Sequence, residues 1–495
     1  MHRRFPQFTV VILLSVAAAV CQEAAPTETP KDVTKETEAG IPVTDPLTIA
    51  KCSGCHRADA NKNLTRISWI RTTPEGWQEA IKRMAQLNGL QLSPEDGRHI
   101  VRYLANEHGL SPEEAEPVRW YLEMTLPQTE PVPNPTIRRA CTTCHAFARP
   151  RTWRRSAAEW HLLKNMHIGY FPLSQFVAFR DMAPPGEPDA PKKPAPVDVA
   201  VEYLAKNYGL FSQSWSAWRA QSTDLDLSGR WVLSASETGK GKYFGEMTVT
   251  RTAPGEYTTA TVLTRVKDGA KFQMPGKSVL YAGFEWRGSA KSEQLGALRQ
   301  VMAVSADQAT IQGRWFWGAY QEFGLTMKAQ RESKDVTVLG TDVISLRAGS
   351  KGVPMQVFGE HFPSDLKPSE IALGAGVTAT KVVSVSPTVV KLTVDTDPKV
   401  FAGKRSIAIH GRAATDAFSV YDRIEYIKIT AETALAHTGG TVGKKGFIQF
   451  EAHAFSNGAD GLPNTADDVD LGPIEAQWSV EEFISHNNDN DKQFV

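Results

Sequence analysis

Two copies of one short pattern, Cys-x-x-Cys-His, constrain this chain more than any other feature. They read "CSGCH" at 52–56 and "CTTCH" at 141–145, and four of the five cysteines in the 495-residue chain lie in them. One such pattern fits a redox disulfide, half of a zinc site or a covalent haem anchor. A zinc pair does not require histidine directly behind its second cysteine, and both copies have it. The repeat therefore predicts two covalently attached haem c groups.

The roles within each copy follow from the chemistry of attached haem. Two cysteine sulfur atoms form thioether bonds to the haem vinyl groups, and the adjacent histidine supplies one axial nitrogen to the iron. The predicted attachment residues are Cys52, Cys55, Cys141 and Cys144, and the predicted proximal ligands are His56 and His145.

The N-terminus has the composition of a secretory signal peptide over residues 1–20. A basic start precedes an apolar run at 8–20, which is too short to span a bilayer as a mature helix. Cys21 then lies at the start of the mature chain, with a lipid anchor there as the alternative. We expect an exported, periplasmic protein with no membrane span. Its 55 basic and 55 acidic residues balance, so no nucleic-acid partner is expected.

Residues 47–222 are predicted to form an all-α, dihaem cytochrome c-like domain. The stretch "VRYLANEHGL" at 101–110 returns as "VEYLAKNYGL" at 201–210, and a tryptophan heads a helix at Trp77 and again at Trp160. Each half therefore contains a haem motif, a helix headed by tryptophan, and a helix carrying "YLA". The predicted repeats are 47–125 and 126–222.

Strand patterns replace helical ones beyond the cytochrome region, so the fold class is multidomain, α followed by all-β. We expect an antiparallel barrel at 223–336 and an immunoglobulin-like sandwich of the IPT or TIG type at 337–423. A C-terminal β domain at 424–495 has no evident closing strand, so it is either incomplete or completed by a partner. Residues 21–46, rich in Glu, Thr and Pro, are expected to be a disordered leader.

Three local features of the β region carry separate expectations. The stretch "SVLYAGFEW" at 278–286 is predicted as a strand. The segment 457–472 gathers carboxylates, Asn and Gly as calcium loops do, although a solvated acidic hairpin is favoured because the EF-hand spacing is absent. We interpret four tryptophans as part of the barrel core or of an interface, and not as redox groups: Trp231, Trp286, Trp315 and Trp317.

The duplication also indicates the sixth iron ligands. Met84 lies seven residues after Trp77, and His167 lies seven residues after Trp160. Methionine and histidine both ligate haem iron, so equivalent positions predict a His/Met haem in the first repeat and a His/His haem in the second. The alternative for Met84 is a core methionine on an apolar helix face. His108 has no liganding equivalent in the other half.

Several motifs occur in an order known from one protein family. "CSGCH", "TPEGW", "YLA", "CTTCH", "EW", "GRW" and "YAGFEWRG" follow one another along most of the chain. In this order the chain resembles the alpha subunit of quinohemoprotein amine dehydrogenase. The specific part is the combination of "TPEGW" with "YAGFEWRG", since Cys-x-x-Cys-His occurs in all attached-haem proteins. The family's last domain is longer than 424–495, which leaves the C-terminal fold open.

The resemblance implies a function for the complex and a role for this chain. In that family a heterotrimer also contains a β-propeller subunit and a small subunit with a cysteine tryptophylquinone. The quinone oxidises primary amines to aldehyde and ammonia, and the haems carry electrons to an external copper protein or cytochrome. This chain has no spare cysteine for a quinone, so we expect no catalytic residue in it. The alternatives are a free-standing dihaem carrier that docks another dehydrogenase and a dihaem peroxidase.

Overall fold

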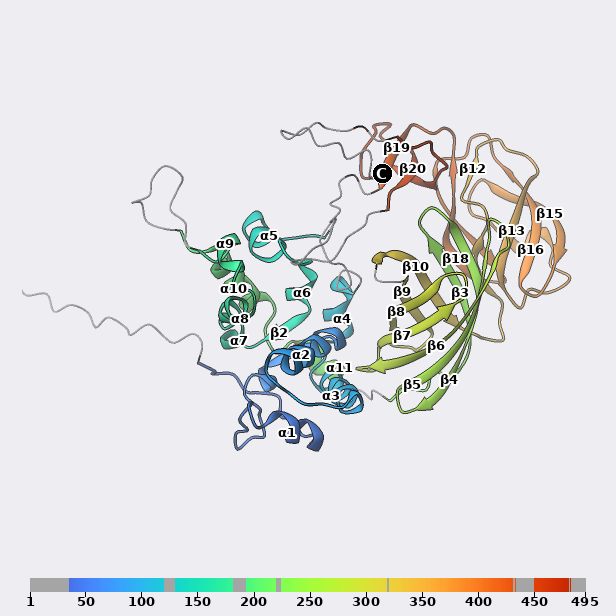
Figure 1. The fold of residues 1–495 in the computed structure, drawn as a ribbon. Coiled ribbons are helices and arrows are strands. Elements are labelled where there is room, and N and C mark those ends of the chain that lie inside the picture. The colour runs from blue at the N-terminus through green and yellow to red at the C-terminus, as the bar shows by residue number, and fades with distance from the viewer. Residues whose placement is uncertain are drawn as a thin grey trace, which may run out of the picture.

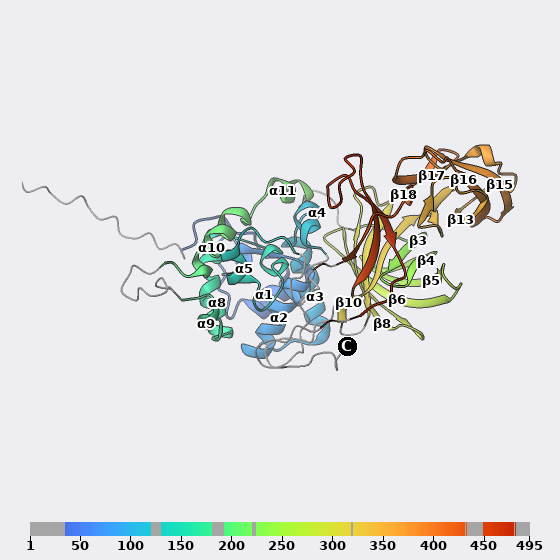
Figure 2. The ribbon, with the colours of Figure 1, turned by 90° about the horizontal axis from the view of Figure 1, so that it is seen from above.

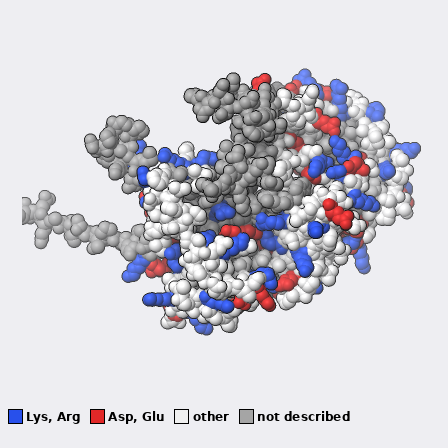
Figure 3. Space-filling view, viewed as in Figure 1, with Lys and Arg blue, Asp and Glu red and all other residues white. Residues whose placement is uncertain are grey.

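The computed structural model describes residues 35–119, 130–180, 193–219, 224–317, 320–430, 432, 449–479 and 481. Within these ranges a helical N-terminal region lies on one side of a β-barrel, and two four-stranded β-sheets lie on the other (Figures 1 and 2). Three parts of the sequence fall outside the described residues: the predicted signal peptide, Cys21, and residues 183–192 of the Pro-rich stretch 183–196. Basic and acidic side chains are interspersed over the face shown in Figure 3.

The first repeat is built around two long helices with strong start signals. Thr73 caps α2 (Pro74–Leu87) and Ser93 caps α3 (Pro94–Glu107), each through its side-chain oxygen, and a proline follows each cap. Such caps satisfy backbone N–H groups that have no partner inside the helix. The shorter elements of this repeat are α1 (Pro46–Cys52), α4 (Pro112–Ala115) and the 3-10 turns Ile67–Trp69 and Glu116–Val118.

The second repeat has the same order of elements but a broken central helix. Leu162 both ends α7 (Ala157–His161) and begins α8 (Leu163–Tyr170), where the first repeat has the continuous α2. The helix with the second "YLA" is α10 (Pro196–Asn207). The remaining helices are α5 (Pro135–Cys141), α6 (Ala148–Arg151), α9 (Ser174–Val177) and α11 (Gln213–Arg219).

A short antiparallel ribbon joins the two repeats. Strand β1 (Ile70–Thr72) pairs with β2 (Trp153–Arg155), and Arg71 lies opposite Arg154 at its centre. Each arginine stands six residues before the tryptophan of its repeat. Equivalent residues therefore meet at the middle of the ribbon, which gives the region an approximate two-fold relation.

Part of the predicted disordered leader packs against this region. Ile41 and Val43 are buried, and the backbone oxygen of Glu38 accepts a hydrogen bond from Nε1 of Trp69 at 2.8 Å. Apolar side chains in this polar-rich stretch remove surface from water, which a window-averaged composition does not reveal. The described part of the leader, from residue 35, is therefore ordered against the helices.

Eight antiparallel strands close into a barrel, as predicted. Strand β10 pairs with both β9 and β3, which completes the ring. The strands are β3 (Gly229–Glu237), β4 (Gly241–Ala253), β5 (Glu256–Arg265), β6 (Lys271–Tyr281), β7 (Glu285–Ser292), β8 (Gly296–Val304), β9 (Thr310–Trp317) and β10 (Tyr320–Arg331).

The prediction of one strand through "SVLYAGFEW" is wrong. Strand β6 ends at Tyr281, and Ala282 and Gly283 turn the chain with φ angles of 49° and 74°. Glu285 then pairs back with Tyr281 at the start of β7. Glycine adopts positive φ without steric cost, which permits a tight turn inside an otherwise strand-like sequence.

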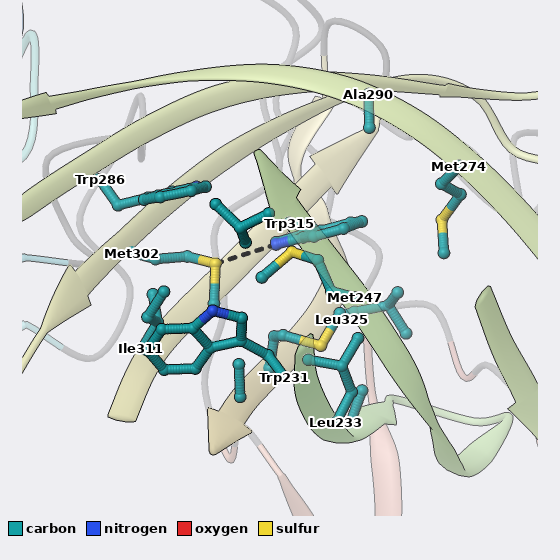
Figure 4. Close-up of a cluster of buried hydrophobic side chains, with 14 of the residues drawn as sticks. Trp231, Leu233, Met247, Met274, Trp286, Ala290, Met302, Ile311, Trp315 and Leu325 are labelled. Atoms are coloured by element: carbon teal, nitrogen blue, oxygen red, sulfur yellow. Dashed lines mark hydrogen bonds between the residues drawn. The ribbon is translucent and has the colours of Figure 1, made fainter. Parts of the chain in front are cut away.

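Tryptophans fill the barrel interior, as predicted. Trp231, Trp286 and Trp315 are fully buried in one apolar cluster (Figure 4). Their N–H groups all find acceptors, and that of Trp315 points at the sulfur of Met302, 3.0 Å away. The side chain of Trp317 lies outside the described residues. These rings are structural, because burying them provides a large apolar area.

Two four-stranded sheets beyond the barrel enclose a second core, and a three-stranded sheet follows. The acidic segment 457–472 comprises the loop that follows Ser456 and the first residues of the strand that begins at Val469, and no group of three or more His, Cys, Asp or Glu among the described residues forms a metal site. The strands are β11 (Thr337–Thr341), β12 (Ser345–Arg347), β13 (Val353–Glu360), β14 (Ile371–Ala372), β15 (Val377–Val385), β16 (Val389–Thr396), β17 (Gly403–Ile409), β18 (Arg412–Tyr421), β19 (Tyr426–Thr430), β20 (Glu451–Ser456) and β21 (Val469–Pro473).

Candidate functional site

The first Cys-x-x-Cys-His motif begins at the last residue of helix α1. Cys52 is buried at that helix end, whereas Cys55 is exposed in the turn that follows. Nδ1 of His56 lies 2.9 Å from the backbone oxygen of Thr65. Because a carbonyl oxygen only accepts, Nδ1 carries the proton and Nε2 keeps a free lone pair. This is the tautomer that an iron ligand requires.

The second motif repeats this arrangement at the end of helix α5. Cys141 is half-buried, Cys144 is exposed, and Nδ1 of His145 lies 2.9 Å from the backbone oxygen of Ala146. Burial lowers the pKa of His145 to about 4, with Arg149 adding to the shift. The imidazole is therefore neutral at physiological pH, with Nε2 available to a metal.

The four motif cysteines are free thiols, and they are not arranged as a zinc site. Burial raises the pKa of Cys52 to about 11 and that of Cys141 to about 12, so both remain protonated. Zinc binding requires thiolates gathered around one point. Among the described residues no three Cys, His, Asp or Glu side chains converge on such a point. Free cysteines followed by a histidine with its Nδ1 on a backbone oxygen fit covalent haem better.

The predicted sixth ligands lie in different surroundings. Nδ1 of His167 faces the backbone oxygen of Leu163 at 2.9 Å, so its Nε2 is also free. The ring of His167 packs against that of Phe179, with the ring centroids 5.6 Å apart. Met84 is half-buried on α2. Within the described residues no hydrogen bond or ring contact joins it to His56, so that pairing stays a prediction from the repeat.

Equivalent contacts support the alignment of the two repeats. Nε1 of Trp77 donates to the backbone oxygen of His108 at 3.0 Å, and Nε1 of Trp160 donates to that of Tyr208 at 2.8 Å. The two tryptophans thus occupy the same position in each half. The break at Leu162 means that the position of His167 is equivalent by sequence count but not along one continuous helix.

A buried charge cluster between the repeats was missed by the sequence analysis. Glu114 accepts two hydrogen bonds from Arg71, at 2.8 and 2.9 Å, and one from Nε of Arg154 at 3.2 Å. We call these three residues the Glu114 cluster. Burial alone would raise the pKa of Glu114, but the hydrogen bonds and charge of Arg71, together with Arg154, lower it to about 2. An arginine six residues before each tryptophan was the available signal.

A second missed cluster connects the helical region to the barrel. Glu75, from "TPEGW", pairs with Arg287, from "YAGFEWRG", and Arg287 also reaches Glu285 at 3.2 Å. The turn residue Ala282 accepts from Nε1 of Trp218 at 2.8 Å and donates to Asn106 at 2.8 Å. The two most specific motifs of the sequence therefore meet at this interface, and the turn that breaks "SVLYAGFEW" docks on the helices.

Comparison with protein-family descriptions matches the chain in four successive segments. Residues 43–183 match "Quinohemoprotein amine dehydrogenase A, alpha subunit, haem binding". Alpha-subunit domains II, III and IV of the same enzyme match 224–332, 335–422 and 427–495. The chain belongs to the quinohemoprotein amine dehydrogenase alpha-subunit family. The predicted family is thereby confirmed, and so is haem binding by the region that holds both motifs.

Membership of this family makes the chain a subunit of a multisubunit amine dehydrogenase. No helix in the described ranges is long and apolar enough to cross a membrane. A search of curated proteins found no match.

Solved structures with local similarity to this chain include designed β-barrels. A de novo designed fluorescence-activating β-barrel is 16% identical, with a TM-score of 0.18, and the match covers 21% of this chain and 93% of that one. A redesigned β-barrel bound to DFHBI is 16% identical, with a TM-score of 0.20, and the match covers 22% of this chain and 100% of that one. These likenesses carry no argument about function.

Proposed function

We propose that this alpha-family chain is the dihaem electron-transfer subunit of a periplasmic quinohemoprotein amine dehydrogenase. Two haem c groups would be attached covalently, one at Cys52 and Cys55 and one at Cys141 and Cys144. Each iron would carry one electron at a time. The periplasmic location rests on the signal-like N-terminus.

The observation that carries the proposal is the same histidine geometry at both motifs. His56 and His145 each direct Nδ1 at a backbone oxygen, 2.9 Å away in both cases. A hydrogen bond at this atom orients the ring and increases the basicity of Nε2, as is usual for metal-bound histidine. A structural histidine has no need of this arrangement directly behind two free cysteines, and here it occurs twice.

The amine chemistry is assigned to a partner. Oxidative deamination of a primary ammonium consumes one water and yields aldehyde, ammonium, two protons and two electrons. A cysteine tryptophylquinone would be the oxidant that accepts the electron pair. Beyond Cys21 every cysteine of this chain belongs to a haem motif, so the quinone must reside in another subunit. We infer a heterotrimer with a small quinone-bearing subunit and a β-propeller subunit, and an external copper protein or cytochrome as acceptor.

The proposed axial ligands set the direction of electron flow. A His56/Met84 haem has the higher potential, because thioether sulfur stabilises reduced iron more than imidazole does. The His145/His167 haem is then the lower of the two. Electrons would pass from the quinone to the second haem, then to the first, then to the acceptor. Axial ligation is one of the factors that spread haem potentials over roughly 0.8 V.

The β domains are assigned a docking role. We propose that residues 337–423 form an immunoglobulin-like sandwich of the IPT or TIG type, which supports the subunits around the haem region. This rests on the two four-stranded sheets over one core.

Haem attachment and amine-dependent reduction together test the proposal. The purified chain should retain two haems after denaturation, and Cys55→Ala and Cys144→Ala should each retain one. Alone the chain should not oxidise amines, whereas addition of the quinone-bearing subunit and amine should reduce both haems. Bound zinc without covalent haem, or amine oxidation by this chain alone, would refute it. Peroxide turnover by the isolated chain would instead support a dihaem peroxidase.

A further inference from the structure

Two arginines near the second motif have buried guanidinium atoms that no acceptor satisfies. Within the described residues, Nε of Arg155 and Nε of Arg83 are both buried and have no hydrogen-bond partner. Arg155 is only 3% exposed. The carboxylate of Glu159 lies 3.8 Å from Arg155, outside hydrogen-bond range, and binds Arg66 at 2.8 Å instead. The ion pair with Glu159 therefore leaves Nε of Arg155 as a buried donor with no acceptor, which a carboxylate ligand would satisfy.

Both arginines lie against the α7–α8 segment that carries His167, although they come from different repeats. Nδ2 of Asn88 donates to the hydroxyl of Tyr170 at 3.1 Å, which joins the end of α2, where Arg83 lies, to the end of α8. The guanidinium of Arg155 lies over the ring of Trp160 on α7, 5.5 Å from its centroid. The two guanidinium groups thus approach the segment that carries His167 from two sides.

This pair has no counterpart at the first motif. The repeat places Thr72 at the position of Arg155 and Met166 at the position of Arg83. The Glu114 cluster shows how this region satisfies arginines when their role is structural, because each is hydrogen-bonded to that carboxylate and to backbone oxygens. At Arg83 and Arg155, in contrast, the Nε atoms have no acceptor within the described residues, so both arginines retain a donor for a ligand.

We propose that Arg83 and Arg155 bind the two propionate carboxylates of the haem attached at Cys141 and Cys144. The planar guanidinium group matches a carboxylate with two parallel hydrogen bonds, and propionates are the acidic groups of a haem. The inference rests on the proposed function, and it adds a difference between the two haems in how their propionates are bound. Cations that neutralise the propionates favour the ferrous state, so they raise the potential of the second haem and offset part of the effect of histidine ligation.

Arg83→Gln in the full-length haem-loaded chain tests this assignment. At a fixed applied potential, the ratio of ferrous to ferric second haem should fall about tenfold, the order of the Coulomb interaction between one lost cation and the additional charge of ferric iron at an effective dielectric of about 20. The propionate bending band in resonance Raman spectra should shift, and the first haem should not change. Lys82→Gln removes one charge from the neighbouring exposed position and should leave both readouts unchanged. Arg83→Lys should retain part of the effect.

The outcomes separate this inference from the proposed function. Absence of covalent haem in the wild-type chain would refute the proposed function itself. Two covalent haems with an unaltered potential and propionate band in Arg83→Gln would overturn the inference alone. An unaltered band with weaker binding of the partner subunits would assign the arginines to a protein carboxylate, which also overturns it. Should Arg155→Gln fail to fold, the half-buried Arg83 still decides the question.

Discussion

The replacement Glu114→Gln should weaken the helical region because Glu114 is the shared acceptor between its two repeats. The variant keeps the shape of the side chain but removes the charge that faces Arg71 and Arg154. The side chain is only 6% exposed, so water screens the interaction little. Two buried guanidinium groups would then face a neutral amide.

The pKa of Glu114 sets the size of the effect. A pKa of about 2 in the folded chain, against 4.5 ordinarily, corresponds to about 3 kcal/mol at neutral pH. Because the pKa of Glu114 is depressed in the folded state, this contribution to stability is fully present above the ordinary pKa of 4.5. It is lost as the pH falls through about 2. The difference between wild type and variant should therefore be about 3 kcal/mol at pH 7 and less than half of that at about pH 3.

Urea unfolding followed by the helical circular dichroism signal measures this difference, because the α-helices of the described residues lie in the haem region. Glu113→Gln is the matched control, since Glu113 is the exposed neighbour of Glu114 on the same helix. The control should change the free energy of unfolding by less than about 0.5 kcal/mol. A loss below about 1 kcal/mol in Glu114→Gln, or an equal loss at both pH values, would refute the reasoning.

Three further predictions concern the ligands and the domain interface. Met84→His should lower the potential of the first haem, as measured by redox titration, and should abolish the ferric methionine–haem absorption band. An unchanged band would show that Met84 is not a ligand. His167→Met should raise the potential of the second haem in the same titration. Burial raises the pKa of Glu285 to about 7, so its ionisation should destabilise the barrel as pH rises from about 4.5 to 7, and Glu285→Gln should remove that part of the pH dependence of urea unfolding. Persistence of the full dependence in Glu285→Gln would assign it to another group.

Some errors of sequence interpretation have clear physical causes. The stretch through Ala282 reads as one strand because its flanking residues alternate correctly, and a turn at Ala282 and Gly283, both with positive φ, breaks it. The chain before Asp45 reads as solvated because polar residues dominate, yet Ile41 and Val43 are enough to anchor it. In both cases one or two residues outweigh the average character of a window.

The sequence by itself determined the family, the haem-binding region, the duplication and the succession of helical and β regions. Covalent attachment needs two cysteines and a histidine in one short stretch, so such a site is visible without a fold. Only the tertiary structure decided which charges meet. Arg71 and Glu114 are 43 positions apart, and Glu75 and Arg287 are 212 apart. Most charged residues are solvated, and an ion pair between them contributes little to stability. An ion pair matters to the fold only where packing excludes water from both partners, and the order of residues does not show where that happens.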